Sequence, residues 1–97
     1  MKTIWKFPIS PNAQLYNTFE IRLKVPAGAV PLCINLQHHR PCLWMEVDPE
    51  APEEKFVMYC VGTGFGAFPE NARYFCSLIE GDYVWHFYIP NEGGYKT

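Results

Sequence analysis

The chain has 97 residues, of which 16% are aromatic and 19% charged, and its formal net charge at pH 7 is −2. This length accommodates one hydrophobic core, so we expect a single domain over residues 1–97. The small negative charge gives no electrostatic reason for non-specific binding to nucleic acid or to an anionic membrane, since both require a surplus of Lys and Arg. The aromatic residues can fill a core and still contribute to an exposed binding face or an oligomer interface.

The N-terminal segment 1–8 has Lys6 and Pro8 where a secretion signal would need an apolar run. No later segment approaches the roughly 18 uncharged apolar residues of a membrane span. We therefore expect an intracellular protein. Its widely spaced cysteines lie within apolar, strand-like runs, so we expect buried free thiols at Cys33, Cys42, Cys60 and Cys76.

Short runs of alternating apolar and polar residues predict β-strands along most of the chain. The clearest alternation covers residues 19–25, where four apolar residues share one face and three charged residues the other. The predicted strands are 4–7, 19–25, 30–36, 42–47, 55–61, 74–79 and 83–89. No segment has a sustained helical period. The fold class is therefore all-β, a single compact antiparallel β-sandwich or partly open barrel of about seven short strands with at most one short helical turn.

Polar, glycine-rich or proline-rich segments separate these strands. Residues 38–41, His-His-Arg-Pro, predict the tip of an antiparallel hairpin, and residues 80–82, Glu-Gly-Asp, predict a second tight turn. The acidic segment 48–54 contains two prolines, which lack a backbone donor, so we expect an exposed connector there. If the chain contains a helical turn, we expect it at the end of the Gly-rich loop 62–71. Residues 91–97 are expected to form a flexible tail.

Several stretches, taken in order, resemble a family of small, mostly uncharacterised proteins encoded by tailed bacteriophages and prophages. They are MKTIWKFP at 1–8, VPAGA at 25–29, PCLW at 41–44, VDP at 47–49, VGTG at 61–64 and VWHF at 84–87. These stretches span nearly the whole domain. The resemblance implies a phage origin and expression in the cytoplasm of a host bacterium, and it implies no established activity.

The Gly-rich loop contains candidate ligand contacts at Gly62, Thr63 and Gly64, because successive backbone N–H groups can form a nest for a phosphate. A P-loop would need a Lys and a Ser or Thr after the glycines, and a dinucleotide site would need a following helix. We therefore favour a simple turn or bulge in this loop. The side chains that would add charge or stacking to a nucleotide-like site are Arg40, Trp44 and Arg73.

Neither metal binding nor catalysis has a recognisable pattern. His38, His39 and Cys42 are close in sequence, but a convincing set of four ligands is missing, so we expect no metal and no cofactor. Ser77 or a cysteine would need a positioned His and a third orienting group to act as a nucleophile, and no motif indicates one. The position of His86 between aromatic residues favours a sheet face. We therefore expect a protein that is not an enzyme.

Acidic residues of the connector form a candidate surface for a basic partner, although a solvated connector is the commoner explanation. These residues are Asp48, Glu50, Glu53 and Glu54. Our leading hypothesis is a non-enzymatic phage accessory protein that acts by binding in counter-defence, as an inhibitor of a host immune protein such as a CRISPR or signalling-effector system. One alternative is a sponge that sequesters a nucleotide immune signal. Another is a structural or assembly oligomer of the phage particle, and in each case we expect a homo-oligomer.

Overall fold

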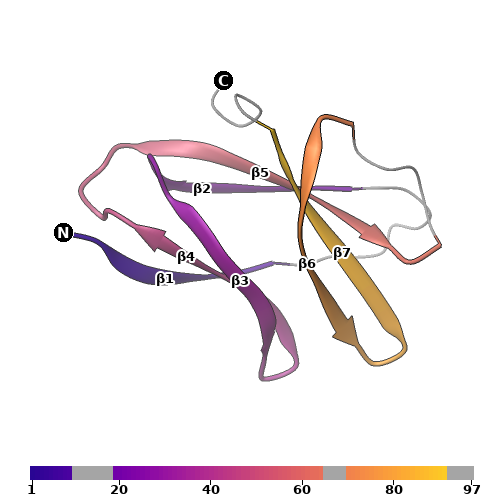
Figure 1. The fold of residues 1–97 in the computed structure, drawn as a ribbon. Helices are drawn as coiled ribbons and strands as arrows, with labels where there is room; N and C mark the ends of the chain where they lie inside the picture. The colour runs from indigo at the N-terminus through magenta and orange to yellow at the C-terminus, as the bar shows by residue number, and fades with distance from the viewer. Residues whose placement is uncertain (10–18, 65–69, 92–97) are drawn as a thin grey trace.

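The computed structural model describes residues 1–9, 19–64 and 70–91, which form seven strands and no helix, and hence no helix that could cross a membrane. The strands are β1 (Thr3–Pro8), β2 (Phe19–Pro26), β3 (Val30–Gln37), β4 (Arg40–Val47), β5 (Glu53–Gly62), β6 (Ala72–Glu80) and β7 (Tyr83–Pro90). They form two antiparallel sheets with the orders β1-β4-β3 and β2-β5-β7-β6 (Figure 1). The predicted all-β antiparallel architecture is confirmed.

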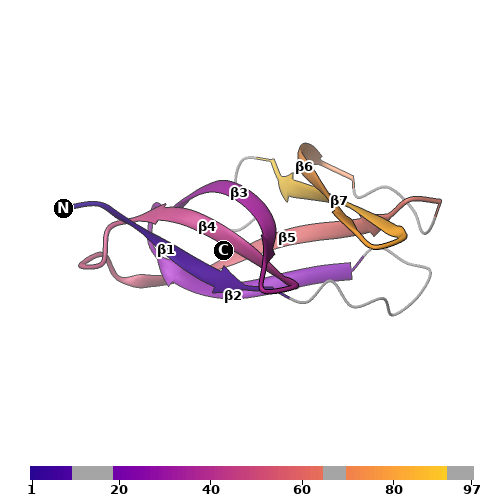
Figure 2. The same ribbon diagram turned by 90° about the horizontal axis from the view of Figure 1, so that it is seen from below.

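Inward-facing side chains of both sheets form one core. Leu43 and Met45 of β4 meet Phe56 and Met58 of β5 and Phe87 of β7, and all five are fully buried. Alternate residues of a strand point to the same face, which is why each strand contributes residues two apart. Figure 2 shows β1, β3 and β4 over one end of the long strand β5, with the β6–β7 hairpin at the other end.

Strand β3 departs from the regular alternation expected of it. A bulge after Pro31 shifts its register against β4. Val30 and Leu32 are consequently 47% and 43% exposed, whereas Ile34 is buried. The prediction of one apolar face along this strand was wrong for its first half, because an extra residue in a strand turns the side chains beyond it to the other face.

The cysteines are free thiols but differ in burial. Cys42 and Cys60 are buried and Cys76 is half-buried, whereas Cys33 is exposed. The expectation of buried thiols was therefore wrong for Cys33, which precedes the buried Ile34 in β3 and faces outward. Burial raises the pKa of Cys60 to about 12. Burial also raises the pKa of Cys76, whose sulfur accepts a hydrogen bond from the backbone N–H of Ile34. This bond links β6 of one sheet to β3 of the other.

The two predicted hairpins are present. His38 and His39 form the tip of the β3–β4 hairpin with φ angles of 53° and 68°, and Arg40 begins β4 opposite Gln37. Positive φ at both central residues is the type I′ geometry that suits the twist of a hairpin. In the β6–β7 hairpin, Gly81 has a φ of 61°.

Two predicted boundaries change. Strand β5 begins at Glu53, inside the segment expected to be a connector, because its pairing with β2 continues until Glu53 lies opposite Pro26. Proline is tolerated there because β2 is an edge strand. Asn91, the first residue of the expected tail, donates its backbone N–H to the carbonyl of Asn71. The rest of the tail, and residues 65–69 of the Gly-rich loop, lie outside the described residues.

Candidate functional site

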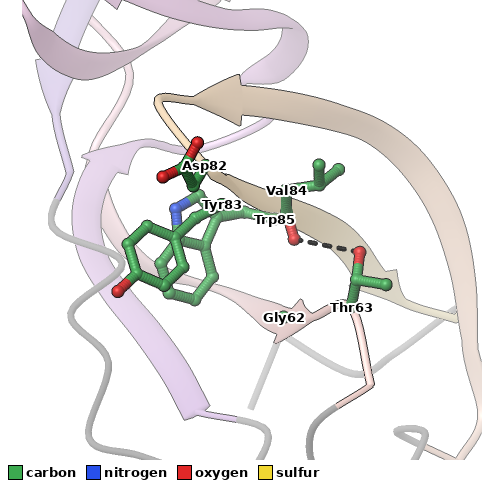
Figure 3. Close-up of a pocket in the computed structure, with 6 residues that line it drawn as sticks. All are labelled: Gly62, Thr63, Asp82, Tyr83, Val84 and Trp85. Carbon is green, nitrogen blue, oxygen red and sulfur yellow. Dashed lines mark hydrogen bonds between the residues drawn. The ribbon is translucent and has the colours of Figure 1, made fainter.

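A surface pocket of about 370 Å³ lies at the end of β5, beside the turn that joins β6 and β7 (Figure 3). Its lining consists of Gly62, Thr63, Asp82, Tyr83, Val84 and Trp85. Ligand pockets typically measure roughly 300–1,000 Å³, so this one is at the small end of the range. A single side chain or a small ligand suits it better than a large one.

Two stacked aromatic rings form one wall of this pocket. The ring centroids of Tyr83 and Trp85 are 5.9 Å apart and their planes differ by 21° (Figure 3). The two residues are two apart in β7 and therefore lie on the same face of the strand. Trp85 is 7% exposed and its Nε1–H donates to Oε1 of Glu80 over 3.1 Å, whereas Tyr83 is 59% exposed. A buried, hydrogen-bonded indole thus supports an accessible phenol ring.

The pocket has an acidic rim. Asp82 belongs to the lining, and Glu80 lies next to it through its hydrogen bond to Trp85. No Lys or Arg is among the described residues that line the pocket. Its electrostatic character therefore favours a cationic or neutral ligand over an anion.

A chain of hydrogen bonds crosses the outer face of the same sheet. The hydroxyl oxygens of Tyr74 and Ser77 are 2.8 Å apart, and Ser77 Oγ is 2.8 Å from Nδ1 of His86. The other ring nitrogen, Nε2, is 2.6 Å from Oγ1 of Thr63, which donates to the carbonyl of Val84 over 3.3 Å. Thr63 and Val84 take part in these hydrogen bonds and also line the pocket.

One proton arrangement around a neutral His86 lets each of the three hydroxyls donate once. In it the Thr63 hydroxyl donates to Val84 and the Nε2–H of His86 donates to Thr63. Nδ1 then accepts from Ser77, whose oxygen in turn accepts from Tyr74. Every hydroxyl donates once in this arrangement. In either tautomer the imidazole is held at both nitrogens, by Ser77 and by Thr63.

The sequence did not indicate that Ser77 and His86 are in contact, or that Thr63 contacts the other ring nitrogen of His86. Ser77 and His86 lie opposite each other on β6 and β7, and no sequence motif marks a contact made by strand register. Neither residue belongs to the pocket lining, which lies toward the side of Tyr83 and Trp85. Of the hydrogen-bonded side chains Tyr74, Ser77, His86 and Thr63, only Thr63 lines the pocket and can contact a ligand seated there.

The structure separates the candidate nucleotide contacts. Gly62 and Thr63 line the pocket, and Gly64 follows in a turn with a φ of 82°. Arg73 lies near the start of β6, far along the strand from the β6–β7 turn, and its Nη1 donates to the carbonyl of Pro90 over 3.2 Å.

The other two candidates are on the second sheet. Arg40 is exposed at the β3–β4 hairpin, and Trp44 is half-buried on β4 between Lys6 of β1 and Cys33 of β3. The residues selected from the sequence therefore do not form one nucleotide-like site in the described structure.

Two of the acidic candidates have structural contacts. A side-chain oxygen of Asp48 accepts the backbone N–H of Glu50 over 3.1 Å, and Oε2 of Glu54 accepts that of Gly28 over 3.2 Å. Glu50 and Glu53 are exposed. Glu53 lines a smaller pocket of about 180 Å³ together with Trp5, Lys24, Val25, Pro26, Pro49 and Ala51. No group of three or more possible metal-ligating side chains occurs among the described residues.

The main residues of the pocket that sequence reasoning missed are Asp82, Tyr83 and Trp85. A signal for them exists, because an acidic tight turn is followed by aromatic residues two apart. The alternation places both rings on one face of the strand. The exposure of the Tyr83 ring could not be predicted in this way, because it depends on where the opposing sheet ends.

The comparison with curated proteins and the comparison with solved structures each found no match. A family model described as a domain of unknown function, DUF7352, matches residues 1–96. This match includes all the strands, the pocket and the hydrogen-bonded chain on the outer sheet face. The chain therefore belongs to the DUF7352 family.

Proposed function

We propose that this protein acts by binding a partner protein, without catalysis, and that the Tyr83–Trp85 pocket is the central contact. The observation that carries the proposal is an accessible tyrosine ring stacked on a buried tryptophan that Glu80 holds by a hydrogen bond. Tyrosine and tryptophan are enriched among the residues that contribute most to protein interfaces. A ring already fixed in place loses little conformational entropy on binding.

A nucleotide sponge has weaker support. A phosphate ligand would need cations or a nest of backbone donors, and the pocket has an acidic rim instead. The arginines selected from the sequence lie elsewhere: Arg73 is bonded to Pro90 and Arg40 is on the other sheet. A protein partner therefore ranks above a nucleotide.

Binding also has better support than hydrolysis. Ser77 and His86 are hydrogen-bonded, but both lie outside the lining of the pocket. A ligand in the pocket would not contact the Ser77 oxygen, and catalysis requires the reacting atoms to be held against the nucleophile.

The biological setting that we propose is the cytoplasm of a phage-infected bacterium, with a host immune protein as the partner that is inhibited. The support for this setting is the resemblance of the sequence to phage-encoded proteins. A structural oligomer is the second candidate, and its support is the outer face of edge strand β6. Ile79 and Tyr74 on that face are 68% and 56% exposed, and apolar side chains on an edge strand favour association between copies.

Native mass spectrometry of the purified protein, before and after incubation with bacterial extract, tests these proposals. A mass increase of tens of kilodaltons is expected from a bound host protein. An adduct of several hundred daltons would support the sponge instead. A homo-oligomer with no further mass would favour the structural candidate and would count against inhibition of a host protein.

Two matched variants locate the contact. Tyr83 and Tyr74 are exposed to similar extents, 59% and 56%, but only Tyr83 lines the pocket. We expect Tyr83→Ala to abolish the added mass and Tyr74→Ala to retain it. Equal retention by both variants would contradict the assignment of the pocket as the contact.

A further inference from the structure

We infer that the pocket recognises an arginine side chain of the partner protein, with the guanidinium stacked on Tyr83 and hydrogen-bonded to the carboxylates beside it. This inference rests on the proposed function and adds to it the chemistry of the bound group. Three features of the pocket support it: the accessible aromatic face, the carboxylates around the turn and the lack of cations in the described lining.

The aromatic wall suits a flat cation. Tyr83 stacks on Trp85 and is 59% exposed, so its ring is accessible to a third planar group. The face of an aromatic ring attracts cations, and arginine makes this contact more often than lysine. A guanidinium is planar and more weakly hydrated than an ammonium, so it can lie parallel to the ring while its edge remains able to hydrogen-bond.

Two carboxylates belong to the turn beside the aromatic pair, within reach of a group seated in the pocket. Glu80 and Asp82 flank Gly81 in the β6–β7 turn, and Tyr83 lies directly opposite Glu80 in the hairpin. Figure 3 shows the Asp82 carboxylate beside the stacked rings. The hydrogen bond from Trp85 Nε1 fixes Glu80. A guanidinium has five N–H donors in a rigid fork and can bond to more than one acceptor, whereas a lysine ammonium is a point charge.

The position of glycine in this turn keeps the two carboxylates together. The pairing of Glu80 with Tyr83 leaves a loop of only two residues, and Gly81 adopts the positive φ of 61° that such a loop requires. The acceptors are thus set by a short turn joined to the strand that carries the aromatic pair. A site on a rigid hairpin needs little rearrangement to bind.

The test uses three short peptides, acetylated and amidated, with the sequences Gly-Arg-Gly, Gly-citrulline-Gly and Gly-Lys-Gly. Citrulline has nearly the shape of arginine but no charge. Each peptide is titrated into the ¹⁵N-labelled full-length protein, and the Trp85 indole N–H and the amides of Asp82, Tyr83 and Thr63 are followed by NMR. We expect the arginine peptide to shift these resonances with an affinity at least tenfold above that of the citrulline peptide, and above that of the lysine peptide.

Variants separate local recognition from net charge. Asp82→Asn should weaken arginine binding severalfold, and Glu50→Gln, which removes an exposed negative charge from the distant connector, should leave it unchanged. Tyr83→Ala should abolish the shifts while the remaining spectrum stays that of the folded protein. Higher salt should weaken the binding, because the attraction between charges is screened.

The outcomes distinguish the inference from the proposed function. Equal affinity for the citrulline and arginine peptides, or shifts of the same resonances by inorganic phosphate, would overturn the inference. If the peptides showed no preference for arginine but Tyr83→Ala abolished binding of the host partner in native mass spectrometry, only the inference of an arginine ligand would be overturned. Retention of that partner by Tyr83→Ala would instead overturn the pocket as the contact.

Discussion

The hydroxyl oxygen of Thr63 lies 2.6 Å from Nε2 of His86, and it is also 3.3 Å from the carbonyl oxygen of Val84. The side chain of Thr63, which directly follows β5, thus contacts both the imidazole and the backbone of β7. Since a hydroxyl has a single proton, Thr63 can donate either to Val84 or to Nε2, and we predict that it donates to Val84 while Nε2–H donates to Thr63.

Replacing Thr63 tests this arrangement. Thr63→Val keeps the shape but removes the acceptor of the Nε2 proton, and we expect a loss of about 1 kcal/mol in the free energy of unfolding. Long-range ¹⁵N–¹H NMR of the imidazole should show the Nε2–H tautomer in the native protein and a mixture in the variant. Thr63→Ser retains the hydroxyl and should preserve both properties. The Nδ1–H tautomer in the native protein would contradict the assignment.

Trp85 should be important for stability as well as for binding. It is 7% exposed within the core, so Trp85→Ala should cost about 3–5 kcal/mol, much of the stability of a small domain. Trp85→Phe retains a ring beneath Tyr83 and removes the donor to Glu80, so its cost should be smaller. Urea unfolding checks both values. Native-like unfolding of Trp85→Ala would show that the indole is not part of the core.

Much of the fold could be predicted from residue alternation because burial of one sheet face imposes a period of two. The run 19–25 alternates strictly and forms β2, with Ile21 and Val25 buried in the core. The bulge after Pro31 could not be predicted, since an extra residue is accommodated by pairing with β4 and leaves no mark of its own in the sequence.

The candidate site was only partly predictable. Glycine content pointed to Gly62 and Thr63, which do line the pocket. Tyr83 has the same strand parity as Phe87, yet one is 59% exposed and the other fully buried. The difference arises from the position of Tyr83 at the hairpin end, which depends on tertiary arrangement. Arg73 and Trp44 were candidates by residue type alone, and strand order places them on different sheets.

The β3–β4 turn offers a stabilising change. His38 and His39 have φ angles of 53° and 68°, a region that costs free energy for most side chains. Asn-Gly is the preferred sequence for a two-residue turn of this type. A left-handed conformation costs a non-glycine residue about 1–2 kcal/mol, and the conformational freedom of glycine in the unfolded chain offsets about 0.5–1 kcal/mol of that gain. The double change His38→Asn and His39→Gly should therefore increase the free energy of unfolding by about 1 kcal/mol, measured by urea unfolding. A decrease would indicate that the imidazoles have stabilising contacts.

Thiol labelling tests the burial of the four cysteines. Because Cys33 is exposed and the other cysteines are at least half-buried, brief treatment with iodoacetamide at pH 8 should add one label, at Cys33. Thiolate formation and access control this reaction. Cys33→Ser should remain unlabelled under the same conditions, and unfolding in urea should expose the rest. Rapid labelling of Cys60 in the folded protein would contradict its burial.

Burial of Cys60 also predicts a dependence of stability on pH. Its pKa rises from 9.0 to about 12 on folding, with desolvation as the cause. Below pH 9 the thiol is protonated in both states and has no effect. Between pH 9 and 12 the unfolded chain releases the proton while the folded protein keeps it, so stability falls, by at most about 1.4 kcal/mol per pH unit. Cys76, whose pKa burial also raises, acts in the same direction.

The measurement is the free energy of unfolding of the native protein and of Cys60→Ala between pH 8 and 10.5. Alanine leaves a cavity and lowers stability at every pH, so the informative quantity is the difference between the two curves. Since titration of the other groups is common to both proteins, this difference should be constant up to pH 9 and then narrow as the native protein loses its advantage. A difference that stays constant to pH 10.5 would show that the Cys60 thiol ionises as readily in the folded protein as in the unfolded chain.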